Sequence, residues 1–325
     1  NTAGKNSSQY KSSPQIELMS LFYFVQHLGE EYNSNSEITY LIENREMWFI
    51  PVVNPDGYVY NESIEPNGGG MHRKNRRDTN CGNGTSRGVD LNRNFGYNWG
   101  ENDIGSSPNP CSDVYRGESS FSEPETQALR DFILNHNFKN VLNFHTYANT
   151  YIHPFGSGLY PEEPDLTTHR EIGNELSKYN KYFVGTCPES IGYTVNGGAS
   201  DWTYGDAGLI SFAPEVGSSS QGFWPPENEI IDLCESQLHP NKIMAFVSGS
   251  DFIVYEYEID QIIINAGDDF DIDITIQNRG LTNSENEVYI TIEPLNNMIS
   301  TDIVNFEMSA IDSRDSDSFS VGCNI

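Results

Sequence analysis

The chain has 325 residues, a mass of 36.5 kDa and a formal net charge of −29 at pH 7. Its length suits one large domain or two ordinary ones, and its content of 36% hydrophobic residues excludes global disorder. The excess of acidic residues would repel a phosphate backbone or an anionic membrane, and no apolar run reaches the roughly 18 to 20 residues of a spanning helix, so we expect neither a nucleic-acid partner nor a transmembrane segment.

Helices and short apolar strands alternate through residues 1–249. In the first predicted helix Met19, Phe22 and Val25 recur at helical spacing, and Ser122-Glu-Pro-Glu125 predicts a capping box at the start of a later helix. Such alternation indicates an α/β domain in which helices cover both faces of a sheet. The predicted helices span residues 16–32, 122–135, 168–179 and 227–246, and the predicted strands span residues 47–53, 140–144 and 209–213.

A different pattern begins near residue 250. Apolar and polar residues then alternate with period two, as in residues 271–277 and 288–293, and only Arg279 and Arg314 are basic. We therefore expect a second domain at residues 250–325, an all-β sandwich of the immunoglobulin-like type that ends without a closing turn. The first domain is expected at residues 1–249.

Basic and amide side chains gather between residues 71 and 94. The run Met71–Arg77 contains four basic residues, and the run Gly88–Asn94 adds Asn92 and Arg93. A guanidinium beside an amide suits bidentate binding of a carboxylate, so the alternatives here are an anion site and a solvated loop.

Two predicted strands end on groups suited to catalysis. The strand at residues 140–144 is followed by His145, and the strand at residues 209–213 is followed by Glu215. A histidine in this place is more often structural than a ligand. A carboxylate after an apolar strand must find a partner or change its pKa.

In order and approximate spacing, these segments resemble the zinc carboxypeptidase A/B family, over roughly residues 8–245. The resemblance implies a mixed, twisted sheet with helices on both faces. It also implies hydrolytic release of the C-terminal residue from peptides by a zinc-activated water. The segments that carry it are Asn54-Pro-Asp-Gly57, the run at Arg73, Gly88–Asn94, His145-Thr-Tyr147, Tyr193 before Gly197–Trp202, and Glu215.

The resemblance implies a catalytic role for four residues. His145 would be a zinc ligand, and Glu215 would be the general base that takes a proton from the attacking water. Arg73 would stabilise the negative oxygen of the tetrahedral intermediate. Asp90 would accept a hydrogen bond from the ring of a histidine ligand.

Four further residues would bind the substrate. Asn92 and Arg93 would hold the terminal carboxylate, which an internal peptide bond lacks, and Tyr193 would close over the substrate. Ser200 stands where family members select the side chain that they accept. A small neutral residue there argues against a pocket dedicated to lysine or arginine.

The family's His-x-x-Glu zinc motif is not found at its expected place, where the sequence reads Lys11-Ser-Ser-Pro14. Cationic lysine and proline cannot ligate zinc, and a catalytic zinc normally needs three protein ligands. We therefore expect weak or absent zinc binding, with hydrolysis absent or severely reduced. The strands that open the family fold are also nearly absent, so the sequence leaves open whether the motif was lost or the front of the chain is truncated. The candidates for a substitute ligand are His27, His72, His153 and Glu17.

Three functional hypotheses follow. The first is a metallocarboxypeptidase family member with impaired hydrolysis. The second is a non-catalytic binder of peptide or protein C-termini that uses the same pocket. The third assigns the biological role to adhesion of the β-sandwich domain to a cell surface or to the substrate.

The five cysteines bear on location. The resemblance implies a disulfide between Cys81 and Cys111, and Cys187 with Cys234 would make a second, which leaves Cys323 unpaired. Two disulfides, an acidic surface and an appended sandwich indicate a secreted or cell-surface protein. The alternative is a cytosolic protein with five free thiols.

Overall fold

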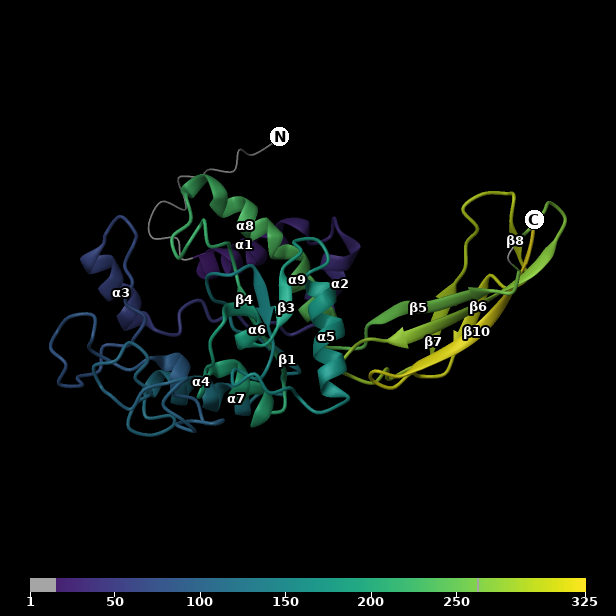
Figure 1. Cartoon of the computed structure of the whole chain (residues 1–325). Helices are drawn as coiled ribbons and strands as arrows, with labels where there is room; N and C mark the ends of the chain where they lie inside the picture. The colour runs from purple at the N-terminus through teal and green to yellow at the C-terminus, as the bar shows by residue number, and fades with distance from the viewer. Residues whose placement is uncertain (1–15, 262) are drawn as a thin grey trace. The chain divides into compact units, whose positions relative to one another are not determined.

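A computed structural model of the chain describes residues 16–261 and 263–325 (Figure 1). The chain divides into two compact units, one that ends at Met244 and one that runs from Ala245 to Ile325. None of the helices in the described residues is long and apolar enough to cross a membrane.

A mixed sheet forms the centre of the first unit. β1 pairs with β4 in parallel, β4 with β2 antiparallel, and β2 with β3 in parallel, in the order β1-β4-β2-β3. The mixed sheet that the resemblance implies is therefore confirmed, as are the strands predicted near residues 140 and 210. The strands are β1 (Asn140–Leu142), β2 (Thr150–Ile152), β3 (Phe183–Gly185) and β4 (Ile210–Glu215).

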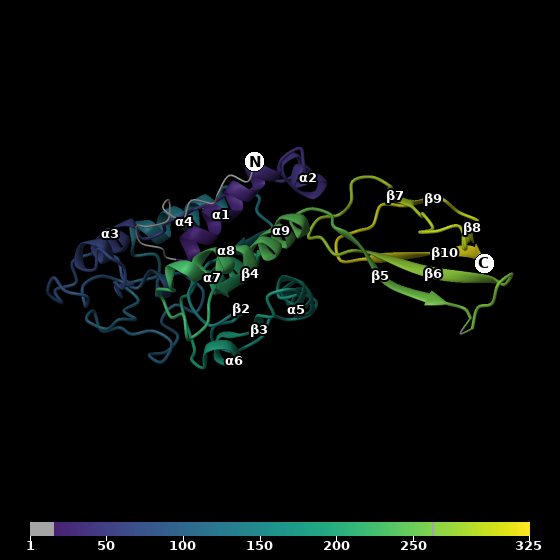
Figure 2. The same cartoon turned by 90° about the horizontal axis from the view of Figure 1, so that it is seen from above.

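Helices cover both faces of this sheet. Successive strand residues point to opposite faces. The Asn140 side chain donates to the carbonyl of Met244 on α9, at 2.8 Å, whereas Val141 packs with Ile133 of α4 and Trp202 of α7. Helices α1 and α8 lie side by side in both views (Figures 1 and 2). The helices are α1 (Ile16–Glu31), α2 (Ser36–Asn44), α3 (Pro55–Ile64), η2 (Leu91–Arg93), α4 (Pro124–Leu134), α5 (Asp165–Leu176), α6 (Cys187–Ile191), α7 (Ala199–Gly205), η3 (Glu227–Glu229), α8 (Ile230–Ser236) and α9 (Leu238–Val247).

The strand predicted at residues 47–53 does not form. Met47 and Phe49 pack against the apolar cluster of Phe24, while Trp48 and Ile50 are exposed, so the side chains alternate as in a strand. No strand pairs with this segment in the described part of the chain. Alternation allows one face of the segment to be buried, but a strand also needs a neighbouring strand that pairs with its backbone N–H and C=O groups.

The helix predicted from residue 122 begins at Pro124, and the predicted capping box is absent. The N-cap is Glu123, whose side chain makes no capping hydrogen bond. Instead, the side-chain oxygen of Asn94 accepts from the Glu123 backbone N–H at 3.3 Å and from the Thr126 hydroxyl at 2.7 Å. The start of α4 is thus stabilised by a residue that is distant in sequence.

The single helix predicted at residues 227–246 forms as η3, α8 and α9. Pro240 in the first turn of α9 has no N–H group and cannot continue the hydrogen-bond ladder from α8. The side chain of Gln237 lies at the break, is fully buried, and accepts a hydrogen bond from the Tyr151 hydroxyl at 3.1 Å.

Cys81 and Cys111 form the disulfide that the resemblance implies. The pairing of Cys187 with Cys234 is wrong, because both thiols are free. Cys187 begins α6, whereas Cys234 lies inside α8 and packs with Ile16 in the apolar cluster at α1.

Beyond the end of α9 at Val247, the second unit is all-β in its described residues. β6 pairs antiparallel with β5 on one side and with β10 on the other, and β7 pairs with β9 in a separate sheet. The two sheets share one apolar core, in which the rings of Phe306 from β9 and Phe319 from β10 stack at 4.5 Å. Assignment to the immunoglobulin-like type stays a prediction. The strands are β5 (Phe252–Ile259), β6 (Asp269–Asn278), β7 (Val288–Thr291), β8 (Ser300–Thr301), β9 (Asn305–Met308) and β10 (Ser316–Asn324).

Candidate functional site

His145 and Glu215 meet at one edge of the sheet. β1 and β4 are parallel, so the residues that follow their carboxyl ends lie together, and His145 forms an isolated parallel bridge with Glu215. The backbone N–H of His145 donates to the carbonyl of Pro214 at 2.8 Å, and Val216 N–H donates to the carbonyl of His145 at 2.9 Å. The two residues that the resemblance places at the reaction centre are neighbours.

The imidazole of His145 is neutral at pH 7. Burial lowers its pKa to about 4, and the charges of Arg73 and Arg93 act in the same direction. Its Nε2 atom lies 3.4 Å from the amide nitrogen of Asn92. Since the Asn92 side-chain oxygen already accepts from the backbone N–H of Ala199 at 2.9 Å, the amide nitrogen is oriented to donate to this ring.

Glu215 has a buried carboxyl group, and burial raises its pKa to about 8. The nearby carboxyl of Glu17 raises this pKa further, and the Arg73 guanidinium opposes the change. The direction of this shift favours the protonated form of the Glu215 carboxyl.

The structure brings Glu17 into the site at the start of α1. Its Oε1 atom accepts a hydrogen bond from the Thr146 hydroxyl at 2.8 Å, next to His145. Its Oε2 atom is buried and has no hydrogen-bond partner within residues 16–261 and 263–325. Burial raises the pKa of Glu17 as well. The sequence signal was an acidic residue between apolar neighbours in the first turn of a helix.

Asp90 joins the two arginines of the site. Its Oδ2 atom lies 3.2 Å from Nε of Arg73 and 3.9 Å from Nη1 of Arg93. Asp90 is buried, and its Oδ1 atom accepts from the backbone N–H of Asn92 at 3.2 Å, which starts η2. The hydrogen bond predicted from the ring of a histidine ligand to Asp90 stays a prediction.

Arg93 is nearly inaccessible and held by two backbone groups. Only 3% of its side chain is exposed, its Nε donates to the carbonyl of Gly105 at 2.8 Å, and its Nη1 donates to the carbonyl of Asn92 at 2.7 Å. Arg73 is 47% exposed. One guanidinium is therefore fixed inside the protein, and the other reaches solvent.

The two guanidinium groups line a common pocket of about 420 Å³. Tyr193 lies at its wall and is 52% exposed, and burial of its hydroxyl together with the carboxyl of Glu215 raises its pKa. No acidic side chain lines the pocket among the residues that the structure describes. The lining residues are Arg73, Arg93, Ile104, Gly105, Val114, Gly192, Tyr193 and Thr194.

Ser200 lies on α7, next to the Asn92 contact at Ala199 but outside this lining. Its hydroxyl accepts from the Asn143 amide at 3.2 Å, and its carbonyl accepts from the Ser211 hydroxyl at 2.8 Å. These bonds hold Ser200 against the strand ends that carry His145. Its predicted role in selecting a side chain stays a prediction.

Within residues 16–261 and 263–325, the side chains do not fit a catalytic zinc ion, because no group of three or more His, Cys, Asp or Glu side chains there could hold a metal. Lys11 and Pro14, which the resemblance puts at the positions of the other two family ligands, lie outside these ranges. His145 remains, and its Nε2 faces the amide of Asn92.

Two of the four substitute ligands suggested by the sequence, His72 and His153, make contacts with backbone carbonyls instead. The ring of His72 contacts the backbone carbonyls of Thr85 and Asn75, both at 3.2 Å. The buried ring of His153 donates to the carbonyl of Pro154 at 2.7 Å. Both rings therefore contact backbone groups elsewhere in the first unit.

Comparison with known proteins identifies relatives of the first unit. The sequence profile of one family, described as zinc carboxypeptidase, matches residues 18–239. Carboxypeptidase B of Astacus astacus is 34% identical over 232 residues, which cover 68% of this chain and 74% of that protein. Mast cell carboxypeptidase A of Homo sapiens is 33% identical over 231 residues, which cover 69% of this chain and 53% of that protein. The chain thus spans about half the length of the latter relative.

Solved structures show the same similarity. The crystal structure of thrombin activatable fibrinolysis inhibitor matches with a TM-score of 0.61 at 28% identity, over 71% of this chain and 58% of that one. Carboxypeptidase A from Helicoverpa armigera matches with a TM-score of 0.61 at 29% identity, over 71% and 57% of the two chains.

Proposed function

Because the chain belongs to the zinc carboxypeptidase family, we propose that it binds the free C-terminal carboxylate of peptides, with hydrolysis of the terminal amide bond absent or severely reduced. The observation that carries this proposal is the pocket that Arg73 and Arg93 line together. It coexists with a reaction centre that lacks a full set of metal ligands in the described residues.

Charge balance favours an anion in this pocket. The guanidinium groups of Arg73 and Arg93 lie near one buried carboxylate, that of Asp90. Two positive charges therefore face one negative charge, and a peptide's terminal carboxylate supplies a second negative charge. A hydrogen bond between such charged groups contributes about 1.5–3 kcal/mol. An internal peptide bond carries no charge, so it would gain little binding free energy from these arginines.

Reduced hydrolysis follows from the same groups. A peptidase of this family needs a metal to activate water and a deprotonated carboxylate to take its proton. Here the described residues provide no group of three side chains that could hold a metal, and the Nε2 atom of His145 faces the Asn92 amide. Lys11 and Pro14 add no ligand atoms. We therefore treat hydrolysis as lost or nearly lost, and binding as retained.

A matched pair of peptides tests this function. The full chain is titrated by calorimetry with one short peptide as the free acid and as the C-terminal amide, and each mixture is incubated and examined by mass spectrometry for cleavage. Zinc is measured after dialysis. We expect tighter binding of the free acid, no cleavage and substoichiometric zinc. Equal affinity for the two peptides would contradict the binding role. Stoichiometric zinc with cleavage of the free acid alone would contradict the loss of hydrolysis.

We also propose an extracellular location, which the disulfide between Cys81 and Cys111 supports, because such bonds persist in oxidising compartments. Adhesion through the second unit stays a prediction. Secretion is checked by fractionating the source cells and probing the medium with an antibody. Recovery of the chain only from the cytosol, with Cys81 and Cys111 reduced, would refute it.

A further inference from the structure

Lys74 is a buried lysine directly after Arg73. Only 1% of its side chain is exposed, which is rare for a lysine unless its ammonium group is bonded. Its Nζ atom donates to the backbone carbonyls of Ser86 at 2.6 Å, Pro110 at 3.1 Å and Ser112 at 2.9 Å. Three N–H donors meet three acceptors, so the ammonium group is fully satisfied.

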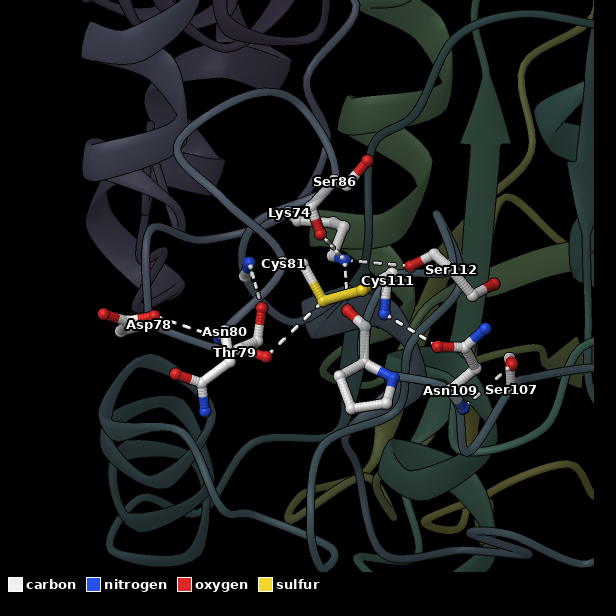
Figure 3. Close-up of a disulfide and its surroundings, with 12 residues drawn as sticks. Lys74, Asp78, Thr79, Asn80, Cys81, Ser86, Ser107, Asn109, Cys111 and Ser112 are labelled. Atoms are coloured by element: carbon white, nitrogen blue, oxygen red, sulfur yellow. Dashed lines mark hydrogen bonds between the residues drawn. A yellow bond between two sulfur atoms is a disulfide. The ribbon is translucent and has the colours of Figure 1, made fainter.

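These carbonyls belong to the two segments that the disulfide joins. Figure 3 shows Lys74 beside the bond between Cys81 and Cys111, with Ser86 on one segment and Ser112 on the other. Pro110 and Ser112 are the immediate neighbours of Cys111. The ammonium group and the disulfide are therefore two separate links between the same pair of segments.

One of these segments continues on both sides into the wall of the carboxylate pocket. Gly105 precedes Cys111 and Val114 follows it, and both line the pocket with Arg73. The carbonyl of Gly105 also accepts from Nε of Arg93 at 2.8 Å. Displacement of this segment would move the pocket wall relative to Arg73.

The backbone next to Lys74 is attached to the segment that contains Asp90. Asn75 N–H donates to the carbonyl of Val89 at 2.9 Å, and Val89 N–H donates to the side chain of Asn75 at 2.8 Å. Arg73 is paired with Asp90, the next residue along. The backbone around Lys74 thus positions Arg73, and the Lys74 side chain holds the segment that contributes Gly105 and Val114 to the pocket.

We propose that Lys74 is a positioning residue for the carboxylate pocket, which acts through Arg73, and that the Cys81–Cys111 disulfide shares this task. The inference rests on the proposed function, because the pocket must bind a carboxylate for its positioning to matter. Lys74 itself is not among the residues that line the pocket.

The test uses the full chain and the same free-acid and amide peptides. The Lys74→Met substitution keeps a side chain of similar length and removes the three hydrogen bonds. We expect it to weaken binding of the free acid about tenfold, the equivalent of one charge-assisted hydrogen bond lost from Arg73, and to leave binding of the amide unchanged. Lys178→Met is the control, because Lys178 is half exposed and pairs only with surface groups.

A double-mutant cycle with Arg73→Met separates positioning from general stabilisation. If Lys74 acts through Arg73, K74M has no further effect on free-acid binding once Arg73 is replaced. An equal loss in both backgrounds, or unchanged binding by K74M, would overturn the inference. The wild type is measured first. If it binds the two peptides with equal affinity, the proposed function itself is wrong.

A second route covers the case in which K74M does not fold at 25 °C, as judged by circular dichroism. The double substitution of Cys81 and Cys111 by serine removes the other link and leaves the buried ammonium group satisfied. The inference is supported if this double substitution weakens the preference for the free acid in the wild-type background and has no further effect in the Arg73→Met background. A preference equal to that of the wild type overturns it.

Discussion

Replacement of Asp90 by asparagine removes the charge that the site's two arginines share. Asparagine keeps the size of the side chain and the oxygen that accepts from Asn92 N–H at the start of η2. The asparagine side chain has no charged oxygen at the position of Oδ2, which lies 3.2 Å from Nε of Arg73 and 3.9 Å from Nη1 of Arg93. The change therefore isolates the ion pairs from the cap.

The expected loss of stability follows from burial. Arg93 is 3% exposed and cannot exchange Asp90 for water, whereas Arg73 is about half exposed and can. Leaving a buried charge without its partner costs about 3–5 kcal/mol, which corresponds to about 6–20 °C in Tm for a domain of this size. We expect most of this cost to come from Arg93.

Differential scanning calorimetry of the full chain measures this shift. The control is Asp103→Asn, which removes an ion pair of 2.8 Å to Arg116 from a side chain that is 67% exposed. That pair should contribute no more than about 1 kcal/mol. A Tm of the Asp90 variant within 2 °C of the control, a margin of about 1 kcal/mol, would show that the buried arginine does not depend on this carboxylate.

Three further outcomes are expected. Burial raises the pKa of Asp201 to about 7, so the folded protein keeps a proton on this carboxyl that the unfolded chain releases from about pH 4 upward. The free energy of unfolding should therefore fall as the pH rises from about 4 to about 7. Asp201→Asn should reduce this pH dependence, as measured by urea unfolding. Gly88→Ala should lower the free energy of unfolding by more than about 2 kcal/mol, because φ of Gly88 is +101° and a Cβ there would overlap a neighbouring backbone carbonyl. Gly84→Ala is the control: a Cβ at Gly84 meets open space, so this variant should have little effect in the same urea assay. Burial raises the thiol pKa of Cys187 and Cys234 to about 12, so mass spectrometry should find both alkylated by iodoacetamide only after denaturation; rapid labelling of the native chain would refute this.

Much of the first unit could be predicted from local pattern. Apolar periodicity identified α1 and the strands that lead to His145 and Glu215, because burial of one helix face or of a whole strand leaves a direct trace in sequence. The strand expected at residues 47–53 failed because pairing depends on a second segment. The capping box at Ser122 failed because Asn94 supplies the acceptor for α4 from elsewhere.

The candidate site shows the same division. The resemblance to the family predicted which groups would bind a carboxylate, and that Lys11 and Pro14 would leave the zinc motif incomplete; both stay predictions. Only the tertiary structure decided that Glu17 lies near Glu215 and that Asp90 joins two arginines. Their partners come from distant segments, and pKa values and ion pairs depend on burial and distance in space.

Lys74 is the clearest case of this limit. In the sequence it is one of four basic residues in a short run, with nothing to distinguish it from a solvated neighbour. Its partners are three backbone carbonyls, which every residue possesses, so no side-chain pattern could reveal them. The sequence by itself determined which chemical groups the chain possesses and which elements it forms locally. The folded backbone determined which groups meet, because contacts between distant segments arise only when the sheet and its loops are assembled.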